Sequence, residues 1–228
     1  MATGELLEIY AEDGTPLGTK DRDQAHLDGD WHRTAQVWAL LTGTPAGPAL
    51  LLAQRTRGKY TWPGLWGATA GGHLAPGETG ADAARREAYE ETGRDPGPGT
   101  LLALGTARVQ DLPGSPGDPG GEDRELRAFY LWPVTLPEAA SLRPDEGEAS
   151  LILAIGLADL AALAAGRGGP APAWPPGGWP PRALCRADLL PSWTYLGAVC
   201  RGMYAYLRGE TRGLEFVSER LTRPARRA

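Results

Sequence analysis

A mixed α/β sandwich is the fold class that the sequence predicts, and three observations support it. Alternating or apolar runs typical of β-strands fill most of the chain before residue 135. One strongly helical pattern interrupts these runs, and further helical patterns follow them. Hydrophobic residues make up 42% of the 228 residues, which is enough for a core. Strands with a helix among them and helices after them are typical of a sheet covered by helices.

The first third of the chain predicts strands. Residues 5–19 form two short runs around an Asp-Gly turn, which predicts a β-hairpin. Residues 32–43 alternate well enough to be a strand, and residues 49–55 predict a buried strand with a polar end. Residues 57–78 predict a long loop interrupted by a short strand, because glycine and proline recur throughout them.

Residues 79–92 carry the clearest helical pattern of the chain. Thr79 can cap the helix, with Asp82 three residues further on, and Gly93 can end it. Successive helical residues turn by about 100° around the axis, so alanines at the right spacing share one narrow face. These alanines, which are small enough to lie close against a sheet, are Ala81, Ala84 and Ala88.

The second half of the chain alternates between regular and turn-forming segments. Residues 100–110 and 124–134 predict strands, and the segment between them, 111–123, is almost purely turn-forming and is expected to be mobile. Residues 157–166 and 193–209 predict helices.

The expected domain organisation divides the chain near residue 165. Residues 1–165 are expected to form the main domain with its N-terminal hairpin. Residues 166–228 are expected to supply a Pro/Gly-rich linker, 166–192, and a C-terminal helix that packs on the same domain. The linker begins with a run of proline, glycine and tryptophan, 166–182, that predicts no regular structure.

Charge and composition exclude several classes of protein. The net charge of −5 and pI near 5.3 argue against nucleic acid as the main partner. Cys185 and Cys200 have no metal-binding or redox spacing. The N-terminal residues lack a basic start followed by an apolar run, so they predict no secretion signal. The longest apolar stretch, 149–165, contains Asp159 and is shorter than a membrane span of about 20 residues. We expect a soluble, cytoplasmic protein.

The predicted helix carries an unusual cluster of carboxylates. Glu87 and Glu91 are one turn apart, Glu90 lies beside them, and residues 71–93 contain no lysine. Arg86 can reach Glu90 at i,i+4. Partly shielded carboxylates are costly unless a hard cation bridges them, and Mg²⁺ in such a site also contacts phosphate oxygens. The alternative is a surface helix with favourable charge pairs.

The same stretch resembles the signature of the Nudix hydrolases. The spacing runs from a glycine through five residues to a glutamate and through seven more to an Arg-Glu pair, followed by a Glu-Glu pair and a glycine. Arg94 stands where the family usually has an apolar residue, which affects packing at the helix end. The matching residues are Gly72, Glu78, Arg86, Glu87, Glu90, Glu91 and Gly93.

This resemblance implies a fold, a cofactor and a reaction. The fold is an α/β/α sandwich around a mixed sheet. Mg²⁺ or Mn²⁺ binds Glu87, Glu90 and Glu91 with help from the Gly71 carbonyl, and water attacks a phosphorus of a diphosphate-linked substrate. The resemblance also implies catalytic roles for Arg86, Glu90 and Glu91. Glu91 or Glu125 can take the proton of the water, and the sequence does not choose between them.

The loop before the helix is similar to that of isopentenyl-diphosphate isomerases and their hydrolase relatives. Arg55 and Lys59 match basic residues of that branch and can hold phosphates. Trp62 and Trp66, in "WPGLW", either stack on a base or fill the loop's core. The branch also has a metal site whose ligands resemble residues of this chain, and His32, His73 and Glu125 are the stronger matches. The full set is His26, His32, His73, Asp123 and Glu125.

The isomerase interpretation has a specific defect at Gly71. The isomerases carry a catalytic cysteine there, and without a thiol the proton transfers at carbon lose a partner. Hydrolysis is therefore favoured, with a nucleoside di- or triphosphate as the expected substrate. The alternatives are isopentenyl-diphosphate isomerisation and a non-catalytic module that binds phosphate ligands. A homodimer is possible through the C-terminal helix.

Overall fold

The computed structural model describes residues 4–59, 61–111, 122–176, 178, 180–210 and 215–221. Its strands are β1 (Leu6–Tyr10), β2 (Pro16–Asp21), β3 (Trp31–Leu41), β4 (Ala49–Arg55), β5 (Trp66–Gly67), β6 (Ala70–His73), β7 (Leu102–Asp111), β8 (Asp123–Val134), β9 (Ala149–Gly156), β10 (Ala171–Trp174), β11 (Arg182–Leu184) and β12 (Glu215–Leu221). Its helices are α1 (Arg22–Asp28), α2 (Gly80–Thr92), α3 (Leu136–Ser141), α4 (Leu157–Ala164) and α5 (Trp193–Leu207), with a 3₁₀ turn at Arg186–Asp188.

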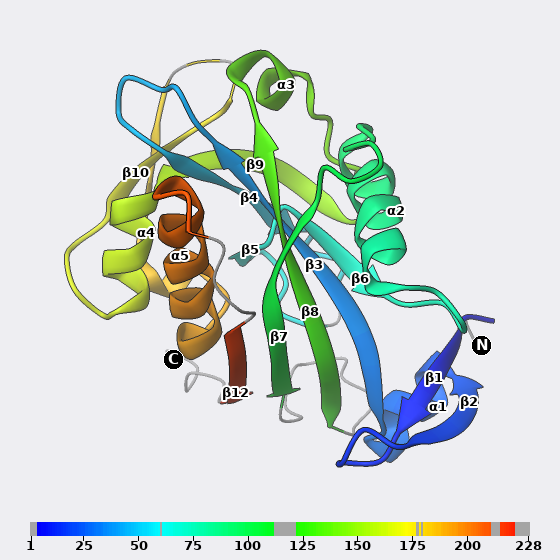
Figure 1. Cartoon of the computed structure of the whole chain (residues 1–228). Helices are drawn as coiled ribbons and strands as arrows, with labels where there is room; N and C mark the ends of the chain where they lie inside the picture. The colour runs from blue at the N-terminus through cyan, green and yellow to red at the C-terminus, as the bar shows by residue number, and fades with distance from the viewer. Residues whose placement is uncertain are drawn as a thin grey trace.

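One mixed sheet organises these elements (Figure 1). Its main path runs β11-β10-β9-β4-β3-β8-β7-β12, and β3 pairs in parallel with β8 along its whole length. The other edge of β3 pairs with β4 near its carboxyl end and with β6 nearer its amino end. The N-terminal hairpin, β1 and β2, joins this amino end through β1. The strand β3 therefore lies at the centre of the sheet and pairs with β1, β4, β6 and β8.

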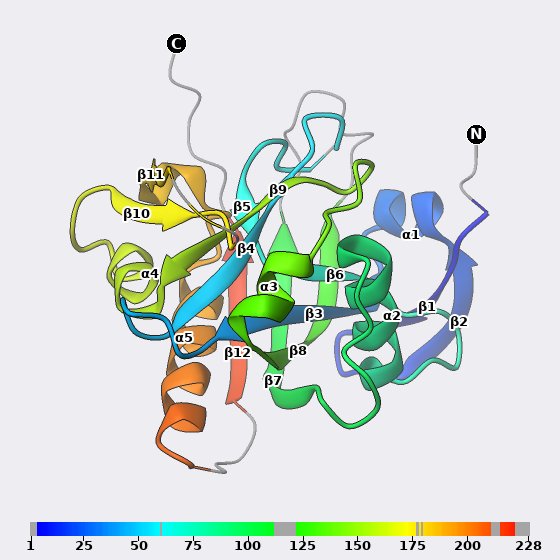
Figure 2. The ribbon, with the colours of Figure 1, turned by 90° about the horizontal axis from the view of Figure 1, so that it is seen from above.

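The alternation of side chains along the strands creates two hydrophobic cores. The helices α4 and α5 lie on one face of the sheet, and α2 and α3 lie on the other (Figure 2). On β3, Trp38 and Leu40 face the first core, whereas Val37 and Ala39 face the second. Strands β4, β8 and β9 divide in the same way, since successive side chains of a strand point to opposite faces. Helices thus cover both faces of the sheet, which confirms the predicted α/β/α sandwich.

The helix α2 begins and ends as the sequence predicts. The Thr79 hydroxyl accepts a hydrogen bond from the Asp82 backbone N–H, and Gly93 ends the helix in the left-handed region, with φ 69°. Ala84 and Ala88 are fully buried against the sheet. The expectation for Ala81 was wrong: it lies exposed in the first turn. Ala83 takes a place in the packed face instead.

The expectation of an irregular linker at 166–182 was wrong, because β10 and β11 form a hairpin there that extends the sheet. Ala171 and Ala173 are buried, while Pro172 between them is exposed, so the segment has the period of a strand. Only Ala173 and Trp174 pair with β9, so the missing N–H of Pro172 falls outside that ladder.

Several elements were not predicted. Strand β9 was missed, although the helix α4 that directly follows it was predicted, because the two form one apolar run in which the change of period is hard to see. The short helices α1 and α3 were also missed. Most of 111–123, the segment expected to be turn-forming and mobile, lies outside the described residues.

None of the helices in the described part of the chain has the length and apolar character that crossing a membrane requires.

The helix α5 shares the core of the sheet, so a cavity in this contact should destabilise the whole domain. Met203 on α5 is fully buried. We expect Met203→Ala to lower the free energy of unfolding by about 2–5 kcal/mol, in a single transition followed by urea denaturation. Leu207→Ala, at an exposed position of the same helix, should change it by less than about 0.5 kcal/mol. A separate early transition for α5 would contradict this prediction.

Candidate metal-binding active site

Two carboxylates of α2 lie beside the two glycines of β6, which have no side chains. A Cβ atom placed on Gly72 of β6 would lie 2.5 Å from Glu87 Oε1, so the Glu87 carboxylate rests directly on the glycine backbone. A backbone hydrogen bond from Gly71 reaches Glu91, one turn further along α2. Glu87 and Glu91 therefore both lie beside the backbone of the two glycines.

The surroundings of these two carboxylates disfavour their charged forms. Burial is the largest cause for Glu91, and the charges of Glu87 and Glu148 add to it, which raises the pKa of Glu91 to about 8. Burial also raises the pKa of Glu87 above its usual range. Two buried acids that repel each other fit a divalent cation with oxygen ligands, because its charge would offset both effects.

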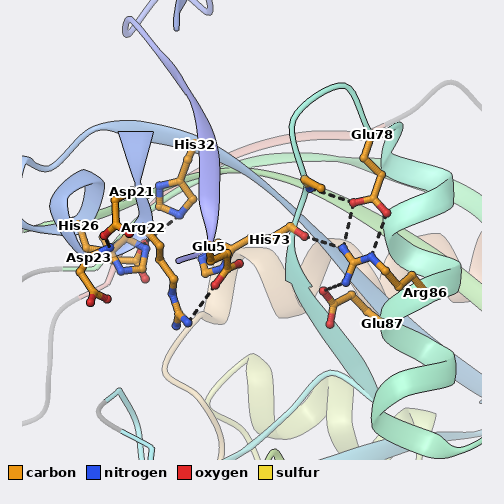
Figure 3. Close-up of polar contacts among 12 residues, drawn as sticks. Glu5, Asp21, Arg22, Asp23, His26, His32, His73, Glu78, Arg86 and Glu87 are labelled. Carbon is orange, nitrogen blue, oxygen red and sulfur yellow. Dashed lines mark hydrogen bonds and ion pairs between the residues drawn. The ribbon is translucent and has the colours of Figure 1, made fainter. Parts of the chain in front are cut away.

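Arg86 links β6 to α2 (Figure 3). Its guanidinium donates to both oxygens of Glu78 at 2.9 Å, to Glu87 at 2.7 Å and to the backbone carbonyl of His73 at 2.9 Å. Burial opposes its charge, but the hydrogen bonds to Glu78 outweigh this and raise the pKa of Arg86 above its usual range. Arg86 therefore acts as a fixed cation that positions Glu87.

Glu90 and Arg94 lie outside this buried contact. Glu90 accepts from Arg86 at 3.2 Å, as the i,i+4 spacing predicts, but its side chain is 55% exposed. Arg94, which departs from the family pattern, forms an ion pair of 2.7 Å with Glu138 of α3. The unusual residue at this position thus fastens the end of α2 to a neighbouring helix.

Charged side chains of β4, of the following loop and of the turn before β9 influence Glu91, and one of them, Glu148, was not predicted from the sequence. Lys59 forms an ion pair with Glu148, just before β9. Burial lowers the pKa of Arg55, and the charges of Glu91 and Glu148 oppose this. Glu148 stands in the acidic turn "DEGE", and nothing in the sequence alone distinguishes it from Asp145 or Glu146.

The two tryptophans of the "WPGLW" loop differ in position. Trp66 is only 3% exposed and belongs to the core under α4 and α5, which favours the alternative that it fills the loop's interior. Trp62 is half-buried and has a φ of 52°, in the left-handed region that non-glycine residues rarely adopt. Such strain is often found at functional loops.

The three histidines of the chain converge on one point (Figure 3). His26 comes from α1, His32 from β3 and His73 from β6, and their ring centroids lie 4.9–5.4 Å apart. The Asp123 carboxylate of β8 lies 3.5 Å from His32 Nε2. Glu125 completes the set, since its ligand atom lies within 4.8 Å of those of His32 and Asp123. The structure brings together all five residues that the resemblance implies.

The donor set of this histidine cluster suits a metal ion. His26 Nε2, His32 Nε2 and Asp123 Oδ1 are buried and have no hydrogen-bond partner among the described residues. Burial lowers the pKa of His26 to about 4 and lowers that of His32, so both rings are neutral and can offer a lone pair. His32 Nδ1 lies 3.1 Å from the carbonyl of Asp30, which fixes the proton on Nδ1 and leaves Nε2 as the ligand atom.

Glu125 is held by hydrogen bonds from two strands, β3 and β8. Thr34 donates to its Oε2 at 3.0 Å, and Arg127 donates to the same oxygen at 2.8 Å through Nε. Burial opposes the charge of Glu125, but the charge of Arg127 and its hydrogen bond outweigh this and lower the pKa of Glu125. The Arg127 guanidinium also stacks on the ring of Tyr195 from α5, 5.1 Å from its centroid. Neither Arg127 nor Tyr195 was singled out from the sequence.

The carboxylate site and the histidine cluster are neighbours on β6. Gly72 contacts Glu87, and the next residue, His73, enters the histidine cluster. Beside His73 and Arg86 there is a pocket of about 440 Å³, which the N-terminal residues 4–6 also line. This volume lies within the range typical of small-molecule sites.

This arrangement agrees with the comparisons with known proteins. The NUDIX domain matches residues 32–171, more than half of the chain, and the chain therefore belongs to the NUDIX family. The crystal structure of DR0079 from Deinococcus radiodurans is similar in fold, with a TM-score of 0.52 and 22% sequence identity, over 72% of this chain and 91% of that chain.

Two relatives match a shorter segment at higher identity. Nudix hydrolase 3 of Arabidopsis thaliana is 37% identical over 72 residues, which are 31% of this chain and 9% of that protein. An isopentenyl-diphosphate Delta-isomerase of Streptomyces avermitilis is 41% identical over 69 residues, which are 30% of this chain and 33% of the isomerase. The match spans a third or less of either relative's length. It supports the predicted likeness to the isomerase branch.

The raised pKa of Glu91 predicts how stability depends on pH in the metal-free protein. Between the ordinary pKa of 4.5 and the folded value of about 8, Glu91 is ionised in the unfolded state but protonated in the folded state. Stability must therefore fall as pH rises through this window, by about 1.4 kcal/mol per pH unit for this group.

Glu91→Gln lacks this titration, so it should be more stable than the wild-type protein near pH 8, and the difference should vanish near pH 4.5. Urea denaturation in the presence of a chelator measures both proteins across the range. Glu90→Gln, which changes a mostly exposed side chain of the same helix, should keep the wild-type slope. A Glu91→Gln variant that is less stable at pH 8 would contradict the assignment.

Proposed function

We propose that the protein is a divalent-metal-dependent pyrophosphohydrolase that cleaves a phosphoanhydride bond of a substrate linked to a diphosphate. One observation carries the proposal: Glu87 and Glu91 are mostly shielded from water beside the backbone of Gly71 and Gly72, with pKa values raised by burial. The ionised carboxylates are costly there unless a cation occupies the site. Membership of the NUDIX family supports the same reaction.

The residues have separable roles in this proposal. Glu87, Glu91 and the Gly71 carbonyl would hold Mg²⁺ or Mn²⁺, with Glu90 at the solvent side. When bound, the cation polarises phosphate oxygens and lowers the pKa of a bound water. The charges of Arg55 and Lys59 favour the ionised form of Glu91, and both side chains could bind phosphate oxygens, which for Lys59 requires exchange of its ion pair with Glu148.

Glu91 and Glu125 stay the two candidates for the proton acceptor. In the metal-free protein burial raises the pKa of Glu91, whereas the charge of Arg127 holds the pKa of Glu125 below its usual range despite burial. A bound cation would lower the pKa of Glu91 as well. Glu125 is suited to hold a second metal ion together with the histidines and Asp123, because among the described residues His26 Nε2, His32 Nε2 and Asp123 Oδ1 are buried without a hydrogen-bond partner.

A nucleoside di- or triphosphate is the proposed substrate class. Trp62 is the loop tryptophan that keeps exposed surface, so it offers a stacking face that the buried Trp66 does not. The pocket beside His73 and Arg86 has the volume for such a ligand. A cytoplasmic location and a homodimer stay predictions of the sequence.

A screen of phosphorylated metabolites tests the proposal. The protein should release phosphate or pyrophosphate from at least one nucleotide with Mg²⁺ or Mn²⁺, and chelator should abolish this. We expect Glu87→Gln to lower kcat about 10³-fold or more, which equals about 4 kcal/mol of lost transition-state stabilisation. Glu146→Gln, in an exposed turn, should keep the wild-type rate. If the protein binds the ligands but cleaves none, the non-catalytic alternative is correct.

Isopentenyl-diphosphate isomerisation is the second candidate, because the histidine cluster and the similarity to an isomerase favour it. The structure of β6 argues against it. A Cβ atom on Gly71 would lie 2.7 Å from the carbonyl oxygen of Ala35 and 3.1 Å from the Gln36 Cα. Because these are backbone atoms of β3, the strand pair leaves no room for the thiol that the isomerases place here.

Gly71→Cys should therefore fail to create an isomerase. We expect the variant to be destabilised, because β6 must move away from β3 to admit any side chain. Incubation of the wild-type protein and the variant with isopentenyl diphosphate, followed by product analysis, measures both activities. Isomer formed by the wild-type protein without phosphate release would defeat the hydrolase proposal. A stable variant with isomerase activity would show that the strand can adapt.

A further inference from the structure

Glu5 contacts the histidine cluster. It belongs neither to the five residues of the cluster nor to the NUDIX signature. It stands just before β1, and its Oε1 lies 3.1 Å from Nδ1 of His73 (Figure 3). Arg22, the first residue of α1, donates to the other oxygen of Glu5 at 3.1 Å. The Arg22 backbone N–H also donates to the Glu5 carbonyl at 2.9 Å. Both oxygens of the Glu5 carboxylate and its backbone carbonyl therefore have partners.

The hairpin places this contact. Leu6 of β1 pairs with Asp21 of β2, so Glu5 and Arg22 are the next pair beyond the ladder. The His73 side chain is 14% exposed and that of Glu5 is 40% exposed, so the carboxylate covers the outer side of the imidazole. The hairpin therefore positions a carboxylate behind a histidine that comes from a different part of the chain.

A carboxylate next to an imidazole nitrogen determines the tautomer of the ring. An ionised carboxylate only accepts hydrogen bonds, so Nδ1 of His73 must carry a proton where it faces Glu5. In the neutral ring, Nε2 then keeps its lone pair for the cluster. His32 has the same arrangement, with the Asp30 carbonyl in place of the carboxylate.

We propose that Glu5 is a positioning residue for the second metal ion, which fixes the proton of His73 on Nδ1 so that Nε2 faces the cluster as a ligand atom. The proposal rests on the metal site proposed for the histidine cluster, and it does not depend on the reaction. Partners of this kind orient ligands and raise their basicity, and their loss costs about 10–100-fold in metal affinity.

Histidine NMR separates this role from a general effect on the hairpin. The chain has only three histidines, so ¹⁵N-labelled histidine gives few signals, and each ring reports its tautomer in the metal-free protein. Titration with Zn²⁺ against a competing chelator, followed through these signals, reads the histidine cluster and not the carboxylates of α2. The variants are Glu5→Ala and the isosteric Glu5→Gln. The matched control is Glu8→Gln, whose carboxylate binds Tyr10 and Gly77 instead.

The expected result is an Nδ1–H tautomer for His73 in the wild-type protein and its loss in Glu5→Ala. Zinc affinity should fall about 10–100-fold in Glu5→Ala and less in Glu5→Gln, whose amide oxygen can still accept. Glu8→Gln should match the wild-type protein in both readouts.

Three results would overturn the proposal: an Nε2–H tautomer in the wild-type protein, unchanged zinc affinity in Glu5→Ala, or an equal loss in Glu8→Gln. Absence of zinc binding at the histidines of the wild-type protein would also overturn it. That last result would leave hydrolysis at Glu87 and Glu91 intact, because phosphate release tests that site separately.

Discussion

The close approach of α2 to the glycines of β6 is the constraint on which the rest of the site depends. Glu87 and Glu91 lie on the packed face of the helix, where apolar side chains are usual, and they fit there because Gly71 and Gly72 leave the space open. Any side chain on Gly72 would displace the Glu87 carboxylate. Burial raises the pKa of both acids, so the same contact that packs the helix also prepares the site for a cation.

The register of β6 explains how one short strand serves two sites. His73 pairs with Thr34 of β3, and residues two apart on a strand share a face, so His73 lies on the face of His32. His32 in turn pairs with Glu125 of β8. Gly72 points to the opposite face, toward α2 and Glu87. A shift of this strand by one residue would remove both arrangements at once.

The sequence predicted those parts of the structure in which local pattern and tertiary contact agree. The strand 49–55 has the predicted bounds, and the helix 80–92 has the predicted caps, because turn chemistry and periodicity both mark them. The strand β10 was missed because its alternation rests on two alanines around an exposed proline. For the site, the spacing of residues within α2 singled out the acids of that helix. Glu148 and Glu5 lie far from α2 in the chain, and only the pairing of strands brings them near Glu91 and His73, respectively.

The helix α5 lies beyond residue 171, where the NUDIX match ends, yet it reaches the site. Its Tyr195 hydroxyl donates to Gln36 and accepts from the Trp38 indole, both at 2.9 Å, and so is fixed to β3. The Tyr195 ring supports the guanidinium of Arg127, which holds Glu125. Because Arg127 is buried, it needs both this ring and the carboxylate to remain charged without water. The orientation of Glu125 in the histidine cluster therefore depends on a helix outside the family match.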